Sequence, residues 1–155
     1  MIRIRKMKMS DLDEVCEIEN EAFLMPWSRD YFEKILSFKF ADAFVAVDEK
    51  ETVLGYLIIF DYDDTLELAN IAVKQGFRRR GIGATLLKKV LEIAKNRRKS
   101  FVTLEVRESN RTARKLYEKF GFKPIRRLKG YYQPNFEDGI LYMLEVNRNR
   151  ENQKT

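Results

Sequence analysis

Histidine is absent from this chain of 155 residues, and its absence narrows the chemistry that the chain can perform. The usual nucleophilic triads, which pair serine or cysteine with histidine, cannot form. A zinc site would have to be built from carboxylates and one thiol, so no metal is expected. Any general base must therefore be a glutamate, an aspartate, a tyrosine or a lysine.

Cysteine is represented by Cys16 alone, which excludes an internal disulfide bond and agrees with a reducing compartment. Its place beside a helical apolar stripe favours a small packing residue over a reactive thiol. No apolar run approaches the roughly 20 residues needed to span a bilayer. The basic N-terminus lacks the apolar core of a signal peptide. We therefore expect a cytoplasmic protein with no membrane partner.

Two well-known phosphate-binding loops are also missing, because the chain contains neither Gly-x-x-x-x-Gly-Lys-Ser/Thr nor Gly-x-Gly-x-x-Gly after a strand. Internal repeats are absent, and nothing indicates a second domain. The hydrophobic content of 45% is typical of a globular chain rather than a disordered one. We predict a single domain over residues 1–146 and a polar C-terminal tail over residues 147–155.

The net charge of +6 attracts polyanions, so RNA, ribosomes and phosphorylated cofactors all fit it as partners. Charge alone does not choose among them. A basic RNA- or ribosome-binding module would use Arg78–Arg80 and the later basic clusters. The sequence contains no helix-turn-helix, no RNP-like aromatic pair and no zinc module, so specific recognition of nucleic acid is not expected.

Apolar patterns of period two predict strands, and patterns of period 3.6 predict helices. We expect Ser10 and Ser28 to cap the first two helices, and Ser109 or Asn110 to cap the last. A long loop with two adjacent tyrosines is expected over residues 130–135. The predicted strands cover residues 2–5, 43–47, 52–62, 65–73, 101–106, 122–128 and 140–146.

The most informative stretch, residues 67–95, indicates a strand, a basic loop with glycines and an amphipathic helix. Such a loop presents backbone N–H groups at the positive end of a helix dipole. Gly81 and Gly83 carry no Cβ, so an anion could approach the backbone closely. The pattern fits either a phosphate site or a plain turn with a solvated basic edge.

Aromatic residues gather in the loop over residues 23–28, between the first two predicted helices. They fit either the core of the fold or one wall of a binding pocket, since loops carry binding residues more often than other elements. Physical reasoning alone leaves both interpretations open.

Two further side chains are candidates for acid–base chemistry. Glu105 stands near the carboxyl end of a predicted strand, where open α/β sheets bind ligands. Its apolar neighbours lead us to expect a desolvated carboxylate; the alternative is a salt-bridged rim residue. Tyr117 lies on the inward stripe of the next helix, so its alternative is a core residue with a tethered hydroxyl.

Several of these motifs together resemble a known family. The run Arg78-x-x-Gly81-x-Gly83 resembles the pyrophosphate loop, Gln/Arg-x-x-Gly-x-Gly/Ala, of the GNAT superfamily of acetyl-CoA-dependent N-acetyltransferases. Residues 70–73 and 104–122 are similar to its flanking strand and second signature block. The Pro-Trp-Ser segment and the Tyr131-Tyr132 element resemble the RimI-type protein N-terminal acetyltransferases. The resemblance extends over about residues 2–146.

The resemblance implies an α/β (α+β mixed) fold: a twisted mixed β-sheet of about six to seven strands flanked by about four helices. It also implies a V-shaped opening for acetyl-CoA between the strand that ends at Val73 and the strand that contains Glu105. Glu105 would be the general base and Tyr117 the general acid. Residues implied to bind the cofactor are Ile71, Ala72, Val73, Arg78, Arg79, Arg80, Gly81, Ile82, Gly83, Ala84 and Asn110. Residues implied to bind the acceptor are Phe23, Leu24, Pro26, Trp27, Tyr131 and Tyr132.

The implied reaction is transfer of an acetyl group to the α-amino group of a protein N-terminus, possible acceptors including a ribosomal protein. A lysine or small-amine acceptor on the same scaffold is the alternative. Arg78 stands where RimI-type enzymes often carry Gln, and both residues occur in the wider family. The basic loop around Tyr131 departs from the family pattern and leaves the acceptor open. We expect a monomer or a weak dimer.

Overall fold

The computed structural model describes residues 1–146, and the predicted tail over residues 147–155 lies outside the described residues. The strands are β1 (Arg3–Lys6), β2 (Ala41–Val47), β3 (Val53–Asp61), β4 (Thr65–Val73), β5 (Phe101–Arg107), β6 (Lys123–Tyr132) and β7 (Glu137–Glu145). The helices are the 3₁₀ turn η1 (Met9–Asp11) and α1 (Leu12–Ala22), α2 (Arg29–Ser37), α3 (Ile82–Asn96) and α4 (Arg111–Lys119).

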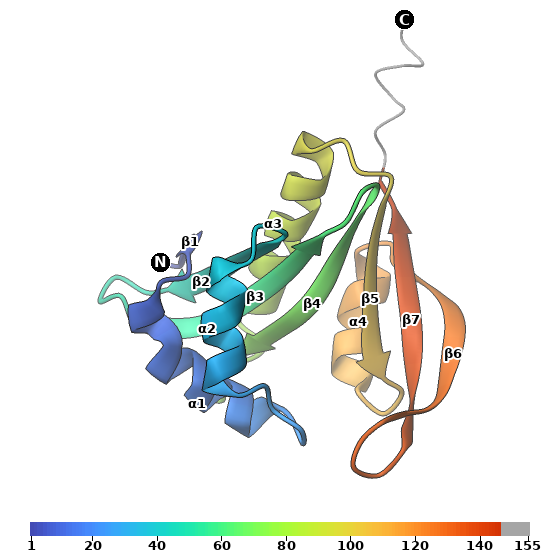
Figure 1. Ribbon diagram of the computed structural model, residues 1–155, viewed down its shortest axis with the longest axis horizontal. Helices are drawn as coiled ribbons and strands as arrows, with labels where there is room; N and C mark the ends of the chain where they lie inside the picture. The colour runs from blue at the N-terminus through green and yellow to red at the C-terminus, as the bar shows by residue number, and fades with distance from the viewer. Residues whose placement is uncertain (147–155) are drawn as a thin grey trace, which may run out of the picture. The chain divides into compact units, whose positions relative to one another are not determined.

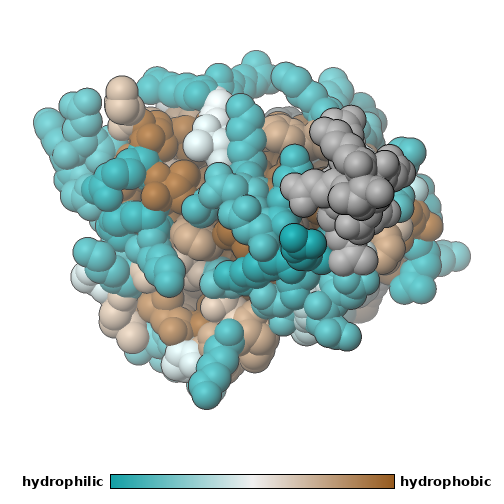
Figure 2. All heavy atoms as spheres, turned by 90° about the horizontal axis from the view of Figure 1, so that it is seen from above, coloured by the Kyte–Doolittle hydropathy of each residue, from teal (hydrophilic) through white to brown (hydrophobic). Residues whose placement is uncertain are grey.

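The seven strands form one sheet in the order β1-β2-β3-β4-β5-β7-β6 (Figure 1). The prediction of a mixed α/β fold with six to seven strands and about four helices is confirmed. Within the described residues, no helix is long and apolar enough to cross a bilayer. Figure 2 shows one face of the molecule, on which hydrophilic side chains cover most of the surface and hydrophobic ones gather in small areas.

Contacts divide the chain into two compact units. The first unit comprises Met1–Asp61 and Leu68–Lys89, and the second comprises Tyr62–Glu67 and the chain from Val90 onward. The chain passes from one unit to the other within β4 and within α3 rather than through a linker. The single domain over residues 1–146 therefore stays our expectation.

In the first unit, α1 and α2 lie on one face of the strands and α3 lies on the other (Figure 1). The helical stripe of α1, with Leu12, Val15 and Ile18, packs against buried residues of β2 and β3. On the opposite face, the Lys89 ammonium of α3 lies 5.3 Å from the centre of the Phe44 ring. β3 is buried along all but its last residue, as expected of a strand covered on both faces.

The caps expected for the first two helices have different outcomes. Ser28 caps α2, because its hydroxyl accepts a hydrogen bond from the Tyr31 N–H at 3.2 Å. The prediction that Ser10 caps the first helix is wrong, since Ser10 lies inside η1 and α1 begins at Leu12. The carboxylate of Asp11 accepts the Lys8 N–H at 2.7 Å, and this bond shapes the turn that precedes the helix.

In the second unit, β7 pairs with both β5 and β6 in antiparallel ladders. α4 packs on this part of the sheet through Tyr117, whose ring centre lies 6.2 Å from that of Tyr142 in β7. The Tyr142 hydroxyl accepts a hydrogen bond from Arg114 at 3.0 Å and donates one to Glu118 at 2.5 Å. These polar contacts hold α4 in one place along β7.

The expected long loop over residues 130–135 is wrong in its first half, residues 130–132, and confirmed in its second. β6 continues through Tyr132, which pairs with Glu137 of β7, and only residues 133–136 connect the two strands. Gly139 permits this extension, because a Cβ there would lie 2.8 Å from the Tyr132 ring. The sequence shows two tyrosines after a glycine, but not the partner strand that draws them into the sheet.

We expect Asp11→Asn to lower the free energy of unfolding by about 2 kcal/mol near neutral pH, because it weakens hydrogen bonds to a charged group. Arg5 donates two of them to Asp11, each 2.9 Å long, and both side chains are largely buried. Burial raises the pKa of Asp11, but the bonds from Arg5 and the Lys8 N–H outweigh it, so the folded-state pKa is lowered.

Because the folded-state pKa of Asp11 is lowered, its bonds contribute their full stability at pH values above the unfolded-state pKa of about 3.9. This contribution is lost as the pH falls through the folded-state pKa. Urea unfolding of both proteins across this range measures the effect. The two stability curves should converge in acid, and a constant gap down to about pH 2 would contradict the assignment.

Candidate active site

Glu105 lies near the carboxyl end of β5, in a strand whose side chains alternate between buried and more exposed. Leu104 and Val106 are buried, while the Glu105 side chain is exposed. The expectation of a desolvated carboxylate is therefore wrong, because strand alternation turns its apolar neighbours to the opposite face. Glu105 Oε1 accepts a hydrogen bond from the Tyr131 hydroxyl at 2.7 Å. Within residues 1–146, its other oxygen has no hydrogen-bond partner.

Tyr131 and Tyr132 stand beside this carboxylate at the end of β6. Their rings meet edge to face with centres 5.0 Å apart. The hydrogen bond to Glu105 raises the pKa of Tyr131 to about 12, so this phenol stays protonated at neutral pH. Burial, followed by the charge of Glu105, also raises the pKa of Tyr132. Both predicted acceptor-binding tyrosines thus lie at the predicted base.

Arg107, which sequence reasoning did not single out, holds the turn that follows these tyrosines. Its guanidinium donates to the Gln133 carbonyl at 2.5 Å, to Asn135 at 3.1 Å and to Glu137 at 3.2 Å. The same group lies 4.7 Å from the centre of the Tyr132 ring. Arg107 therefore keeps the tip of the β6–β7 hairpin against β5.

Glu67, at the start of β4, is a second acid that the sequence did not reveal as special. Its side chain is half-buried, and it belongs to the same unit as Glu105. Burial and then the charge of Glu105 raise the pKa of Glu67. The side chains of β4 alternate between buried and half-buried, and this alternation places Glu67 on the half-buried face. That alternation is the signal that could have revealed it.

Tyr117 has a buried ring and a hydroxyl that no residue holds. The ring packs against Phe122 and Tyr142, and burial raises the pKa of the phenol. Within residues 1–146, the hydroxyl makes no hydrogen bond, yet it is not a fully buried unpaired atom. The alternative of a tethered hydroxyl therefore does not describe Tyr117, whose oxygen retains some exposure.

Glu105 and Tyr117 lie on opposite faces of β5. Leu104 lies opposite Tyr142 in the antiparallel register, and the Tyr142 ring contacts Tyr117 of α4. Alternation along β5 then places Glu105 on the face away from α4.

The basic loop before α3 is built from unusual backbone conformations. Gly76, Arg79 and Gly81 have φ values of 89°, 64° and 82°. Arg78 donates to the Val73 carbonyl at 3.1 Å, and the Arg80 guanidinium lies 5.1 Å from the centre of the Phe77 ring. The loop is closed by its own side chains, while Arg78–Arg80 and Gly81 are exposed.

The remaining predicted cofactor residues lie on either side of this loop or at the start of α4. Ala72 is buried, and Ile71 and Val73 are half-buried at the end of β4. Ile82, Gly83 and Ala84 form the first turn of α3, whose N–H groups have no partner within the helix. Asn110 caps α4 by accepting the Ala113 N–H at 3.2 Å, so this oxygen already has a structural role.

The loop over residues 23–28 was expected to belong either to the core or to the wall of a binding pocket, and its residues divide between a packed and an exposed group. Phe23 and Trp27 are half-buried and pack against the core of the first unit. The Trp27 ring centre lies 4.9 Å from that of Tyr31. Between them, Leu24 is 64% exposed and Pro26 is also exposed. The ends of the loop belong to the core, and its centre is free to meet another molecule.

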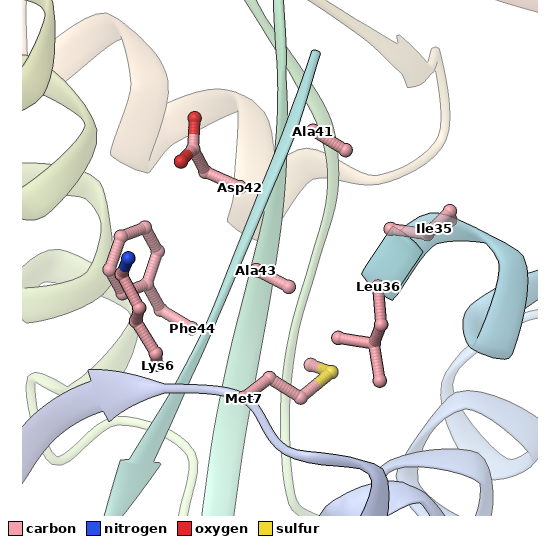
Figure 3. Close-up of a pocket in the computed structure, with 8 residues that line it drawn as sticks. All are labelled: Lys6, Met7, Ile35, Leu36, Ala41, Asp42, Ala43 and Phe44. Atoms are coloured by element: carbon pink, nitrogen blue, oxygen red, sulfur yellow. The ribbon is translucent and has the colours of Figure 1, made fainter. Parts of the chain in front are cut away.

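Figure 3 shows a hollow of about 150 Å³ elsewhere in the first unit. None of the predicted site residues lines it, so it is separate from the candidate active site. Its lining residues are Lys6, Met7, Ile35, Leu36, Ala41, Asp42, Ala43 and Phe44.

Comparison with known proteins identifies the family of this chain. The acetyltransferase (GNAT) family model matches residues 12–122. A Bacillus subtilis protein, provisionally named a ribosomal protein bS18-alanine N-acetyltransferase, is 33% identical over 145 residues, covering 93% of this chain and 95% of its own. A Haemophilus influenzae protein with that activity in its name is 34% identical, covering 83% of this chain and 86% of its own.

A solved structure of a protein with the same activity in its name also resembles this chain. The ribosomal-protein-S18-alanine N-acetyltransferase of Escherichia coli superposes with a TM-score of 0.86 at 29% identity, covering 94% of each chain. These likenesses extend over both compact units of the described chain.

We expect Gly81→Ala to raise the dissociation constant of acetyl-CoA at least about tenfold, or about 1.4 kcal/mol. Its φ of 82° is strained for any side chain, and the added Cβ would stand where a phosphate must approach the first turn of α3. Isothermal titration calorimetry with acetyl-CoA measures the change.

Gly76→Ala is the matched control for Gly81→Ala. Gly76 lies in the same loop with a φ of 89°, and neither glycine has a protein atom within 4 Å of an added Cβ. The backbone strain is therefore similar, but Gly76 lies six residues before α3. Equal weakening in both variants would assign the effect to loop strain and would remove Gly81 from the phosphate site.

Proposed function

Because this chain belongs to the GNAT acetyltransferase family, we propose that it transfers an acetyl group from acetyl-CoA to the α-amino group of a protein N-terminus. The observation that carries the proposal is the similarity along almost the whole chain to proteins named for acetylation of an alanine in ribosomal protein bS18. A ribosomal protein is the acceptor we favour, and it places the reaction in the cytoplasm.

An α-amino group suits the base that this chain offers. Its pKa is about 7.7–8.0, against about 10.4 for lysine, so far more of it is neutral and nucleophilic at physiological pH. Glu105 has one oxygen held by Tyr131 and one without a partner in the described chain. In our proposal the unpartnered oxygen takes the amine proton, directly or through one water, and Tyr131 keeps the carboxylate in place.

In our proposal Tyr117 is the acid that completes the reaction. Acetyl-CoA supplies the thioester carbonyl that the amine attacks and the thiolate that leaves. The raised pKa of Tyr117 keeps its hydroxyl protonated, and that hydroxyl has no competing partner within residues 1–146. In our proposal this hydroxyl hydrogen-bonds to the departing sulfur and passes its proton as negative charge develops there. Because the raised pKa makes the phenol a weaker acid than a thiol of pKa near 8.5, the transfer is uphill, and the phenolate is reprotonated from solvent.

The first unit contributes the proposed contacts to the pyrophosphate and to the acetyl carbonyl. The exposed loop Arg78–Arg80 and the free N–H groups of the first turn of α3 provide positive charge and donors for a pyrophosphate. A backbone N–H near Val73 would polarise the acetyl carbonyl as the oxyanion develops. Leu24, Pro26 and the half-buried Trp27 offer apolar surface to the acceptor.

Paired peptides test the choice of acceptor. We expect faster acetyl transfer to a peptide with a free N-terminus than to an otherwise identical peptide with a blocked N-terminus and one exposed lysine. The physical reason is the larger neutral fraction of the α-amine. Mass spectrometry locates the added acetyl group. Preferential modification of the blocked peptide would replace our proposal with a lysine acetyltransferase.

Conservative substitutions test the chemical step. Glu105→Gln and Tyr117→Phe should each lower kcat by roughly 10²–10⁴-fold, the usual value of general acid–base assistance. Acetyl-CoA affinity should stay close to that of the unmodified protein, because neither change adds bulk. Steady-state kinetics and calorimetry separate the two quantities.

Tyr142→Phe is the control for Tyr117→Phe. Its ring neighbours that of Tyr117, but its hydroxyl is bound by Arg114 and Glu118. We expect it to lower thermal stability and to leave kcat nearly unchanged. Full activity in Tyr117→Phe would return Tyr117 to the role of a core residue.

A further inference from the structure

Glu19, on α1, is a buried carboxylate without a cation. Its side chain is 1% exposed, and within residues 1–146 it forms no ion pair. Asp11, the other buried acid of the described chain, is paired with Arg5. Because burying an unpaired charge is costly, the chain satisfies Glu19 with neutral donors from three separate segments.

Glu19 holds both ends of the loop that follows α1. Its backbone carbonyl accepts the Phe23 N–H at 3.2 Å, and its Oε2 accepts the Trp27 N–H at 2.9 Å. The three residues between these two anchors project from the fold, with Leu24 64% exposed and Met25 59% exposed. One residue therefore fixes where an exposed apolar loop begins and ends.

The same carboxylate ties this loop to the sheet. Glu19 Oε1 accepts hydrogen bonds from the Tyr56 hydroxyl of β3 and from Asn70 Nδ2 of β4, the latter at 2.7 Å. Asn70 immediately precedes residues 71–73, the segment expected to line the acetyl group. The two carboxylate oxygens thus link the expected acceptor loop to the strand expected to hold the acetyl group.

We propose that Glu19 is a positioning residue that holds the loop over residues 23–27 in the shape that receives the acceptor's first residues. This inference rests on the proposed function. A well-packed apolar side chain could fill the site of Glu19 at lower cost in stability. The retained carboxylate is explained by the position it gives to the Trp27 N–H and, through it, to Leu24–Pro26.

Glu19→Met tests the proposal, because methionine keeps a similar length and helix propensity but accepts hydrogen bonds only weakly. We expect the KM for an acceptor peptide to rise at least about tenfold, while the KM for acetyl-CoA changes by less than about twofold. Trp27 is the only tryptophan of the chain. Its fluorescence should shift to longer wavelength as the loop loosens.

Glu19→Gln is the conservative variant. The amide oxygen of the new glutamine can still accept the Trp27 N–H. Its NH₂ group then takes the place of the other oxygen, and the Tyr56 hydroxyl and the Asn70 amide can both turn to accept hydrogen bonds from it. We expect its peptide KM and its fluorescence to stay near those of the unmodified protein. Glu19→Asp keeps the charge, but its shorter side chain should not reach the Trp27 N–H. Its peptide KM and fluorescence should therefore resemble those of Glu19→Met, and it serves as the test if Glu19→Met does not fold.

Asp11→Asn controls for a general loss of stability. It weakens a buried acid of the same unit without touching the loop, so peptide KM and Trp27 fluorescence should not move. Unchanged fluorescence in both loosened Glu19 variants would overturn the inference, as would equal changes in the KM of both substrates. A shift in Trp27 fluorescence with an unchanged peptide KM would overturn the claim that the position of this loop sets acceptor binding. No transfer to any α-amine by the unmodified protein would instead refute the proposed function.

Discussion

The first unit depends on how one buried negative charge is satisfied. Glu19 receives hydrogen bonds from a backbone N–H, a phenol and an amide, and none of these donors carries a charge. The neighbouring problem at Asp11 is solved differently, by a guanidinium at the edge of the fold. An ion pair at Glu19 would need a long cationic side chain in the core. Small neutral donors instead allow the helix, the loop and two strands to meet at one point.

In our proposal, the second unit carries the acid–base chemistry of a chain without histidine. A single imidazole can take and return a proton, whereas a carboxylate and a phenol divide these tasks. Alternation along β5 sends Glu105 to one face and leaves the other face to α4 and Tyr117. Tyr131 and Arg107 are supporting residues: one holds the carboxylate and the other holds the hairpin that carries Tyr131 and Tyr132.

Elements with a local signal were predictable from the sequence. The bounds of β4 match the predicted strand, and Ser28 caps α2 because the capped N–H lies only three residues away. Ser10 has the same chemistry, but the side chain of Asp11 binds Arg5 and the Lys8 N–H and forms a separate turn. β6 was underestimated because Tyr131 and Tyr132 read as a loop until β7 pairs with them.

The sequence by itself determined the family, the order of the elements, the basic loop before α3 and the absence of histidine from the acid–base chemistry. These features follow from short sequence spacings and from composition, which do not depend on the tertiary packing of the chain. Only the tertiary structure decided that Glu105 is exposed and held by Tyr131, 26 residues away. It also decided that Glu19 meets Asn70 across 51 residues. Such hydrogen bonds exist only once packing of the strands and helices brings their donors and acceptors together, and no local pattern encodes that distance.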